Sequence, residues 1–203
     1  MYSTVSHRST SDSPQSALLE RIPISQRIVA VIDTRRDGNV SPLVIALARR
    51  DRASVVLYDL STGSRWTTPF ETDDERQRVG NCILSAARLE SLSHRTAALA
   101  VSALGRAGVW AGAFLATRPA AEELSELVWT RHIDLVVAPG SLRGKTLRNV
   151  ERVRWHGAAL VQGHPENGLT VHPPLITHAV HETSHDSANP FSSWFRRFPV
   201  AFR

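Results

Sequence analysis

The sequence has very little cysteine or lysine. Its 203 residues include a single cysteine, Cys82, and a single lysine, Lys145. One cysteine cannot form an internal disulfide, so the composition favours a reducing compartment and we predict a cytoplasmic protein. Cys82 stands beside Ile83 and Leu84 in a predicted helix, where a buried and inert thiol is expected. The N-terminal residues also lack the basic, apolar and small-residue pattern of a secretory signal.

Long uninterrupted apolar runs are absent too. One mostly apolar stretch, 97–116, contains Arg106 near its middle. A central arginine costs about 2.5–3.5 kcal/mol in a membrane-spanning helix. We therefore predict no membrane segment here, but a helix, a turn at Gly105–Gly108 and a buried strand.

The chain carries a mild excess of positive charge. Its formal net charge is +5 and its pI is about 10.5. An excess of this size is compatible with an anionic ligand. It is much smaller than that of a typical duplex-DNA-binding protein, which argues against a nucleic-acid partner.

Composition divides the chain into three parts. Residues 1–26 are rich in Ser, Thr, Gln and Pro and are predicted to form a disordered arm. Residues 27–162 alternate apolar, β-rich runs with helical segments, which predicts a parallel sheet covered by helices on both faces. Residues 163–203 form a Pro/His-rich extension that could fold over the domain, contact a partner or remain loose. The five predicted strands are Arg27–Asp33, Ala53–Asp59, Val109–Ala116, Ile133–Ala138 and Ala158–Gln162.

The segment after the fourth predicted strand has the composition of an anion-binding loop. It reads Gly140-Ser141-Leu142-Arg143-Gly144-Lys145-Thr146 and leads into a predicted helix at 145–156. Free backbone N–H groups at such a helix start can bind phosphate. The ending Gly-Lys-Thr also resembles a Walker A motif, but Pro139 stands where that motif needs its first glycine. A solvated lysine at an ordinary helix start is the alternative.

Two further polar features accompany this loop. Asp33 ends the first predicted strand, at the carboxyl edge where ligands bind in open α/β sheets. It could instead cap the loop that follows. Lys145, Arg148 and Arg152 lie on one face of the predicted helix. That face could bind RNA, an acidic protein or a phosphate, but most such faces are simply solvated.

No catalytic or metal-binding set stands out. His178, His181 and His185 have a spacing that is usable on a helix, but their Ser- and Asn-rich surroundings favour a polar tail, and we predict no metal site. Ser–His–Asp sets can be assembled from many residues and mean nothing without geometry. We therefore predict a protein without catalytic activity.

Residues 27–162 resemble the universal stress protein family, a branch of the adenine-nucleotide α-hydrolase-like α/β group. Val29-Ala30-Val31-Ile32-Asp33 resembles the Val-Ala-Val-Asp that opens the family's first strand. The segment 119–137 resembles its third helix and fourth strand, and 151–161 resembles its last helix and strand. The resemblance implies a Rossmann-like sheet of five parallel strands in the order 3-2-1-4-5.

The glycine loop departs from the family's pattern. Nucleotide-binding members have Gly-x2-Gly-x9-Gly-Ser/Thr after the fourth strand, whereas three residues separate Gly140 from Gly144 and the later Gly-Ser is absent. The phosphate loop is therefore degenerate. The resemblance implies that an adenine nucleotide such as ATP would lie across the carboxyl ends of strands one and four. Asp33 would lie near its ribose, and Gly140, Ser141, Gly144, Lys145 and Thr146 near its phosphates.

These observations predict a non-catalytic stress-response or regulatory protein that binds an adenine nucleotide. A nucleotide-free protein-interaction module with the same fold is one alternative, favoured by the degenerate loop. An ATP-utilising enzyme of the same group is another, although residues 34–38 lack the Ser-Gly-Gly-x-Asp-Ser type of loop that such enzymes have after strand one.

A homodimer is also predicted. Members of the resembled family commonly pair the free edge of the fifth strand with its own copy, which here is the strand at 158–162. Within one chain, Leu169-Thr170-Val171 could instead cover that edge. The aromatic cluster of Trp194, Phe195, Phe198 and Phe202 could bury itself over the sheet rather than at an interface.

Overall fold

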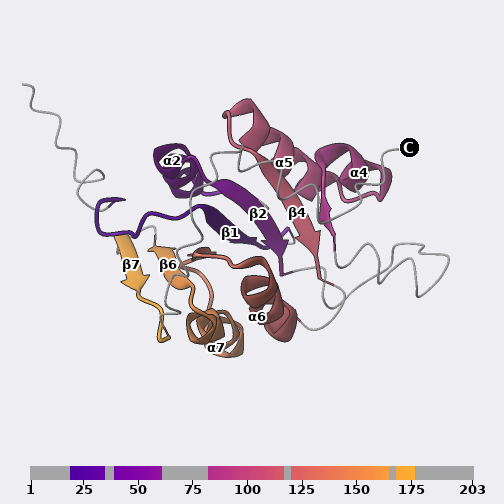
Figure 1. Ribbon diagram of the computed structural model, residues 1–203. Coiled ribbons are helices and arrows are strands. Elements are labelled where there is room, and N and C mark those ends of the chain that lie inside the picture. The colour runs from indigo at the N-terminus through magenta and orange to yellow at the C-terminus, as the bar shows by residue number, and fades with distance from the viewer. Residues whose placement is uncertain (1–18, 35–38, 61–81, 117–119, 165–167, 177–203) are drawn as a thin grey trace, which may run out of the picture.

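The computed structural model describes residues 19–34, 39–60, 82–116, 120–164 and 168–176 (Figure 1). These residues form one sheet with helices on both faces. One face is covered by α2 (Pro42–Asp51), α4 (Ala86–Ser91) and α5 (Arg95–Arg106). The other face is covered by α6 (Ala120–Arg131), α7 (Gly144–Glu151) and the 3₁₀ helix η2 (Arg152–His156).

The described part of the sheet has seven strands in the order β3-β4-β2-β1-β5-β6-β7. They are β1 (Arg27–Ile32), β2 (Ser54–Asp59), β3 (Ile83–Leu84), β4 (Ala111–Leu115), β5 (Leu135–Pro139), β6 (Ala159–His164) and β7 (Gly168–His172). The Rossmann-like α/β class is confirmed, and the five central strands are parallel and follow the predicted order.

The prediction of five strands, all parallel, is wrong at both edges of the sheet. β3 and β7 are additional strands, and both pair antiparallel with their neighbours. β3 falls where a helix was predicted. It contains only two residues and is therefore too short to show any periodic pattern in the sequence. β7 alternates exposed and half-buried positions, so it lacks the continuous apolar run by which the central strands were found.

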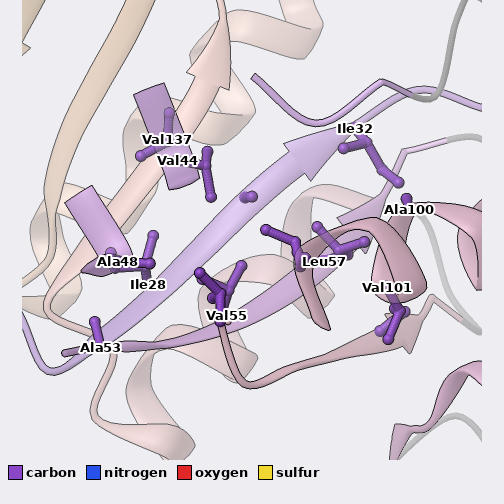
Figure 2. Close-up of a cluster of buried hydrophobic side chains, with 14 of the residues drawn as sticks. Ile28, Ile32, Val44, Ala48, Ala53, Val55, Leu57, Ala100, Val101 and Val137 are labelled. Atoms are coloured by element: carbon purple, nitrogen blue, oxygen red, sulfur yellow. The ribbon is translucent and has the colours of Figure 1, made fainter. Parts of the chain in front are cut away.

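β1 explains why the helices form two layers. Successive side chains of a strand point to opposite faces. Ile28, Ala30 and Ile32 belong to the core under α2 and α5, while Val29 and Val31 belong to the core under α6 and α7. Figure 2 shows the first core, in which Val44, Ala48, Val55, Leu57, Ala100, Val101 and Val137 surround the side chains of β1.

The stretch 97–116 folds as predicted. Ala97, Ala100, Val101 and Leu104 are buried at the helical spacing i, i+3, i+4, i+7 of α5. Gly108 then turns the chain with a φ of 75°, and β4 follows. Among the described residues, no helix combines the length and the apolar character needed to cross a bilayer.

Two expectations about chain segments are corrected. Cys82 precedes β3 rather than lying in a helix, and its side chain is exposed rather than buried. Residues 19–26, assigned to the N-terminal arm, contact the domain, because Ile22 is 2% exposed in the core and the Ser25 N–H donates to Asp51 Oδ2 at 3.0 Å. The predicted boundary at residue 27 therefore lies too far along the chain. Residues 1–18 are outside the described part.

The outer edge of β6 is occupied by the same chain. Val161 pairs with Val171, and Gln162 with Thr170, in the antiparallel ladder with β7. The predicted boundary at residue 162 is therefore too early, and the extension supplies a strand of the sheet. A homodimer that pairs two β6 edges would require β7 to dissociate from β6. The structure instead agrees with the alternative in which Leu169-Thr170-Val171 covers this edge within one chain. The oligomeric state itself is a prediction that light scattering of the full chain would test.

A glycine explains how β3 can lie against β4. A methyl group added at Gly112 would meet the side chain of Ile83 and would come within 3.1 Å of the Leu84 carbonyl oxygen. We expect Gly112→Ala to lower the free energy of unfolding by about 1–3 kcal/mol, as measured by urea denaturation. Gly105→Ala is the matched control, because nothing lies within 4 Å of its added methyl group and alanine favours a helix by about 0.5–1 kcal/mol. Equal stability of Gly112→Ala and wild type would contradict this close packing.

Candidate functional site

The crevice at the carboxyl ends of β1 and β5 is the first candidate site. These strands are neighbours, but β2 lies on the far side of β1 and β6 on the far side of β5. In open α/β sheets, ligands bind outside the carboxyl ends of the strands where the strand order reverses in this way. Asp33 directly follows β1 and Gly140 directly follows β5. The fold therefore brings the two predicted site segments to one edge of the sheet.

The loop between β5 and α7 is closed by its own contacts. The Gly140 N–H donates to the Gly163 carbonyl oxygen at 2.7 Å, which ties the loop to β6. Leu142 is buried in the core under α6 and α7. The Arg143 guanidinium donates to the carbonyl oxygens of Gly140 and of Leu142, the latter at 2.9 Å. The loop thus has a fixed shape and holds a cation that the sequence reasoning did not assign to the site.

The start of α7 leaves backbone donors exposed. Arg143 precedes the helix with extended backbone angles, and its side chain makes no capping hydrogen bond. Gly144 opens the helix with a φ of 58°, a left-handed conformation that favours glycine. The first N–H groups of a helix have no partner within the helix, and the helix dipole favours an anion there. Lys145 and Thr146 are exposed at this point.

The predicted site residues therefore divide into three groups by their exposure. Ser141, Gly144, Lys145 and Thr146 are exposed around the start of α7, where they could meet an anion. Gly140 is buried, and its N–H is already used by Gly163, so it can shape the loop but cannot donate to a phosphate. Asp33 is half-buried at the end of the neighbouring strand.

The charged face of α7 and η2 is exposed as predicted. The side chains of Lys145, Arg148 and Arg152 are exposed, while Val150 and Val153 are buried against the sheet. The predicted histidine set at 178, 181 and 185 lies outside the described residues.

A buried carboxylate was missed by the sequence reasoning. Asp59 is 2% exposed at the end of β2, opposite Ile32 of β1. It accepts hydrogen bonds from the Thr34 N–H at 3.2 Å and from the Thr34 Oγ1 hydroxyl at 2.6 Å. These bonds hold Thr34, which directly follows Asp33, against the end of β2. The sequence did contain a sign of this carboxylate, because Asp59 is an ionisable residue at the end of an otherwise apolar strand. The sequence analysis counted Asp59 as the last residue of that strand and assigned it no function.

His94 lies within the electrostatic influence of this carboxylate. It directly precedes α5, and burial lowers the pKa of its imidazole below the ordinary value of 6.5. The negative charge of Asp59 opposes part of that shift in the pKa. The carboxyl edge of β2 therefore combines a buried acid, the hydroxyl that binds it and a histidine that resists protonation.

The comparisons with known proteins concern the fold. No family profile and no curated protein match the sequence. A crystal structure of a universal stress protein family member from Burkholderia pseudomallei is similar, with 18% identity over 68% of this chain and 94% of its own, and a TM-score of 0.41. A universal stress protein from Archaeoglobus fulgidus is similar too, with 16% identity over 63% of this chain and 86% of its own, and a TM-score of 0.39. Both belong to the family that the sequence resembles.

The lowered pKa of His94 makes a prediction about stability. Because its pKa is lower in the folded than in the unfolded chain, the unfolded chain binds more protons between the two values, and stability falls as the pH drops below about 6.5. We expect His94→Gln to lose less unfolding free energy than wild type between pH 7.5 and pH 5.5 in urea titrations. His132→Asn, at an exposed histidine, should keep the wild-type pH dependence. Identical pH profiles for wild type and His94→Gln would show that His94 does not contribute.

Proposed function

We propose that this chain is a non-catalytic regulatory protein of the universal stress protein type, and that it binds an adenine nucleotide at the carboxyl ends of β1 and β5. The observation that carries the proposal is the uncapped, exposed start of α7 at the point where the strand order reverses. The nucleotide phosphates would lie against the first turn of α7, and the ribose would lie near Asp33. The choice of adenine rests on the family resemblance of residues 27–162.

Charge supports a phosphate ligand at this place. Lys145, the single lysine of the chain, stands in the first turn of α7. The Arg143 guanidinium is fixed in the adjoining loop by the carbonyl oxygens of Gly140 and Leu142. Together with the helix dipole, these two cations favour an anion at the same end of the helix.

A nucleotide-free interaction module is the second candidate, and one observation favours it. The Gly140 N–H already donates to Gly163 at 2.7 Å, so the loop has fewer free donors than its length suggests. A shallow phosphate contact at Gly144–Thr146 would then be the whole anion site, and its affinity would be low. Direct nucleotide binding separates the two candidates.

Ligand-induced stabilisation is the first test. Binding to the folded state at a ligand concentration of 100 times Kd adds about 2.7 kcal/mol to the free energy of unfolding. We expect ATP, ADP or AMP to raise the melting temperature of the full chain in a concentration-dependent way, without release of phosphate above the uncatalysed background. If none of the three nucleotides changes the melting temperature at millimolar concentration, the interaction-module candidate is favoured instead.

Variants of the α7 start locate the site. Lys145→Ala removes a charge-assisted contact and Gly144→Val places a β-branched side chain where the phosphate would approach, so each should weaken nucleotide binding by about tenfold or more in calorimetric titration. Gly108→Val is the matched control for backbone strain, because Gly108 has a φ of 75° and open surroundings on another turn. Arg106→Ala controls for the loss of one exposed positive charge. Unchanged affinity in both site variants would exclude this loop.

A further inference from the structure

A groove between α6 and η2 exposes an aromatic ring. It has a volume of about 590 Å³ and is lined by Ser125, Glu126 and Trp129 of α6 and by Arg152 and His156 of η2. The ring centroids of Trp129 and His156 are 6.3 Å apart in an edge-to-face arrangement. This contact leaves Trp129 53% exposed.

Other large apolar side chains are exposed around the same 3₁₀ helix. Trp155 of η2 is 58% exposed. A 3₁₀ helix has three residues per turn, so Trp155 lies on the same side as Arg152. Leu175 and Ile176 are exposed as well, and the Leu175 N–H donates to the Arg154 carbonyl oxygen at 2.9 Å. Exposed apolar clusters of this kind usually mark an interaction surface.

The described chain ends beside η2, which forms one wall of this groove. Two hydrogen bonds attach the segment after β7 to η2, one from Leu175 to Arg154 and one from Arg154 Nε to the Pro173 carbonyl oxygen at 2.8 Å. The sequence continues after Ile176 for a further 27 residues, 177–203. Its aromatic side chains are concentrated in 191–202, which we call the aromatic tail segment. They are Phe191, Trp194, Phe195, Phe198 and Phe202.

We propose that the aromatic tail segment binds in the α6–η2 groove of its own chain. Trp194 or Phe195 would cover the exposed face of Trp129, and Arg152 would lie over the incoming ring as a cation–π partner. Arg196 and Arg197 follow directly and carry charge opposite to that of Glu126. The segment thus supplies apolar surface for Trp129 and two cations for Glu126, while Arg152 in the lining has the same sign as those cations.

The covalent connection through residues 177–190 favours the aromatic tail segment over other ligands of the groove. Fourteen residues, 177–190, separate the end of the described chain from the aromatic tail segment. As a random coil, a chain of that length would span roughly 20 Å on average, and fully extended it would reach about 46–50 Å. Its effective concentration at the groove is on the order of millimolar, so a weak intrinsic affinity would keep the groove filled. A second copy or another molecule would have to displace it.

Disulfide trapping in the full chain tests the proposal. With Cys82→Ser as background, Ser125→Cys in the groove and Ser193→Cys beside Trp194 can form a disulfide only if their Cα atoms approach to about 4.4–6.8 Å. Ser91→Cys on α4 replaces Ser125→Cys in the control, because α4 covers the opposite face of the sheet. We expect disulfide formation within one chain to be about tenfold faster, or more, for the groove pair than for the control pair.

Two further substitutions make the readout specific. Trp129→Ala should reduce the trapping rate of the groove pair to that of the control pair. Glu126→Arg should reduce it as well, and adding Arg196→Glu with Arg197→Glu to that variant should restore it at least in part. A structural disturbance of α6 by Glu126→Arg would not be repaired by changes in the tail.

Three outcomes would overturn the proposal. Equal trapping rates for the groove and control pairs would show that the tail does not bind there. Disulfides between two chains, together with a dimer in light scattering, would show that the groove binds the tail of a second copy of the chain. The third outcome concerns single-stranded RNA. In that outcome, labelled oligouridine binds the full chain, and this binding is weakened by Trp129→Ala but unaffected by Trp194→Ser, Phe195→Ser and Phe198→Ser. That result would show that nucleic acid, and not the tail, binds in the groove.

Discussion

The parallel pairing of β1 with β5 is the contact on which both the fold and the candidate site depend. Val29 pairs with Val136 in this ladder, and both side chains lie in the core under α6 and α7. β1 is buried on both faces, so its apolar residues fix two helical layers at once. The same pairing places Asp33 and the loop after β5 at one edge of the sheet. A change that separated these strands would remove the core and the site together.

The central fold could be predicted because each parallel strand is a run of buried apolar residues with a helix after it. The edges were harder to predict, since β3 has two residues and β7 is half exposed. β7 was foreseen only as the alternative in which Leu169-Thr170-Val171 covers the fifth strand. The position of Cys82 was wrong for the same reason, because a two-residue strand followed by α4 was taken as continuous helix. β3 pairs with β4, which is distant in sequence, whereas β7 pairs with the directly preceding β6. In both cases the pairing decides the structure, and local periodicity does not contain that information.

The sequence marked the segments that form the candidate site, but not the contacts that the structure shows there. The glycines and Lys145 led to the prediction of a phosphate loop before α7, whereas the hydrogen bond from Gly140 to Gly163 depends on β6. The roles of Arg143 and Asp59 also depend on side chains that meet only after folding. Arg143 satisfies carbonyl groups of its own loop, and Asp59 accepts two hydrogen bonds from Thr34. Both residues therefore stabilise backbone that adjoins a predicted site residue, Arg143 beside Gly144 and Asp59 beside Asp33.

The segment formed by α7 and η2 separates the two proposed binding surfaces. Its first turn carries the exposed donors and Lys145, and its last turn carries Arg152, Trp155 and His156 beside the groove. Val150 and Val153 anchor the middle of the segment in one core at 1% and 0% exposure. Close-packed interiors do not deform gradually. Binding at the groove should therefore leave the first turn of α7 in place, and the two surfaces can be occupied independently unless α7 moves as a whole.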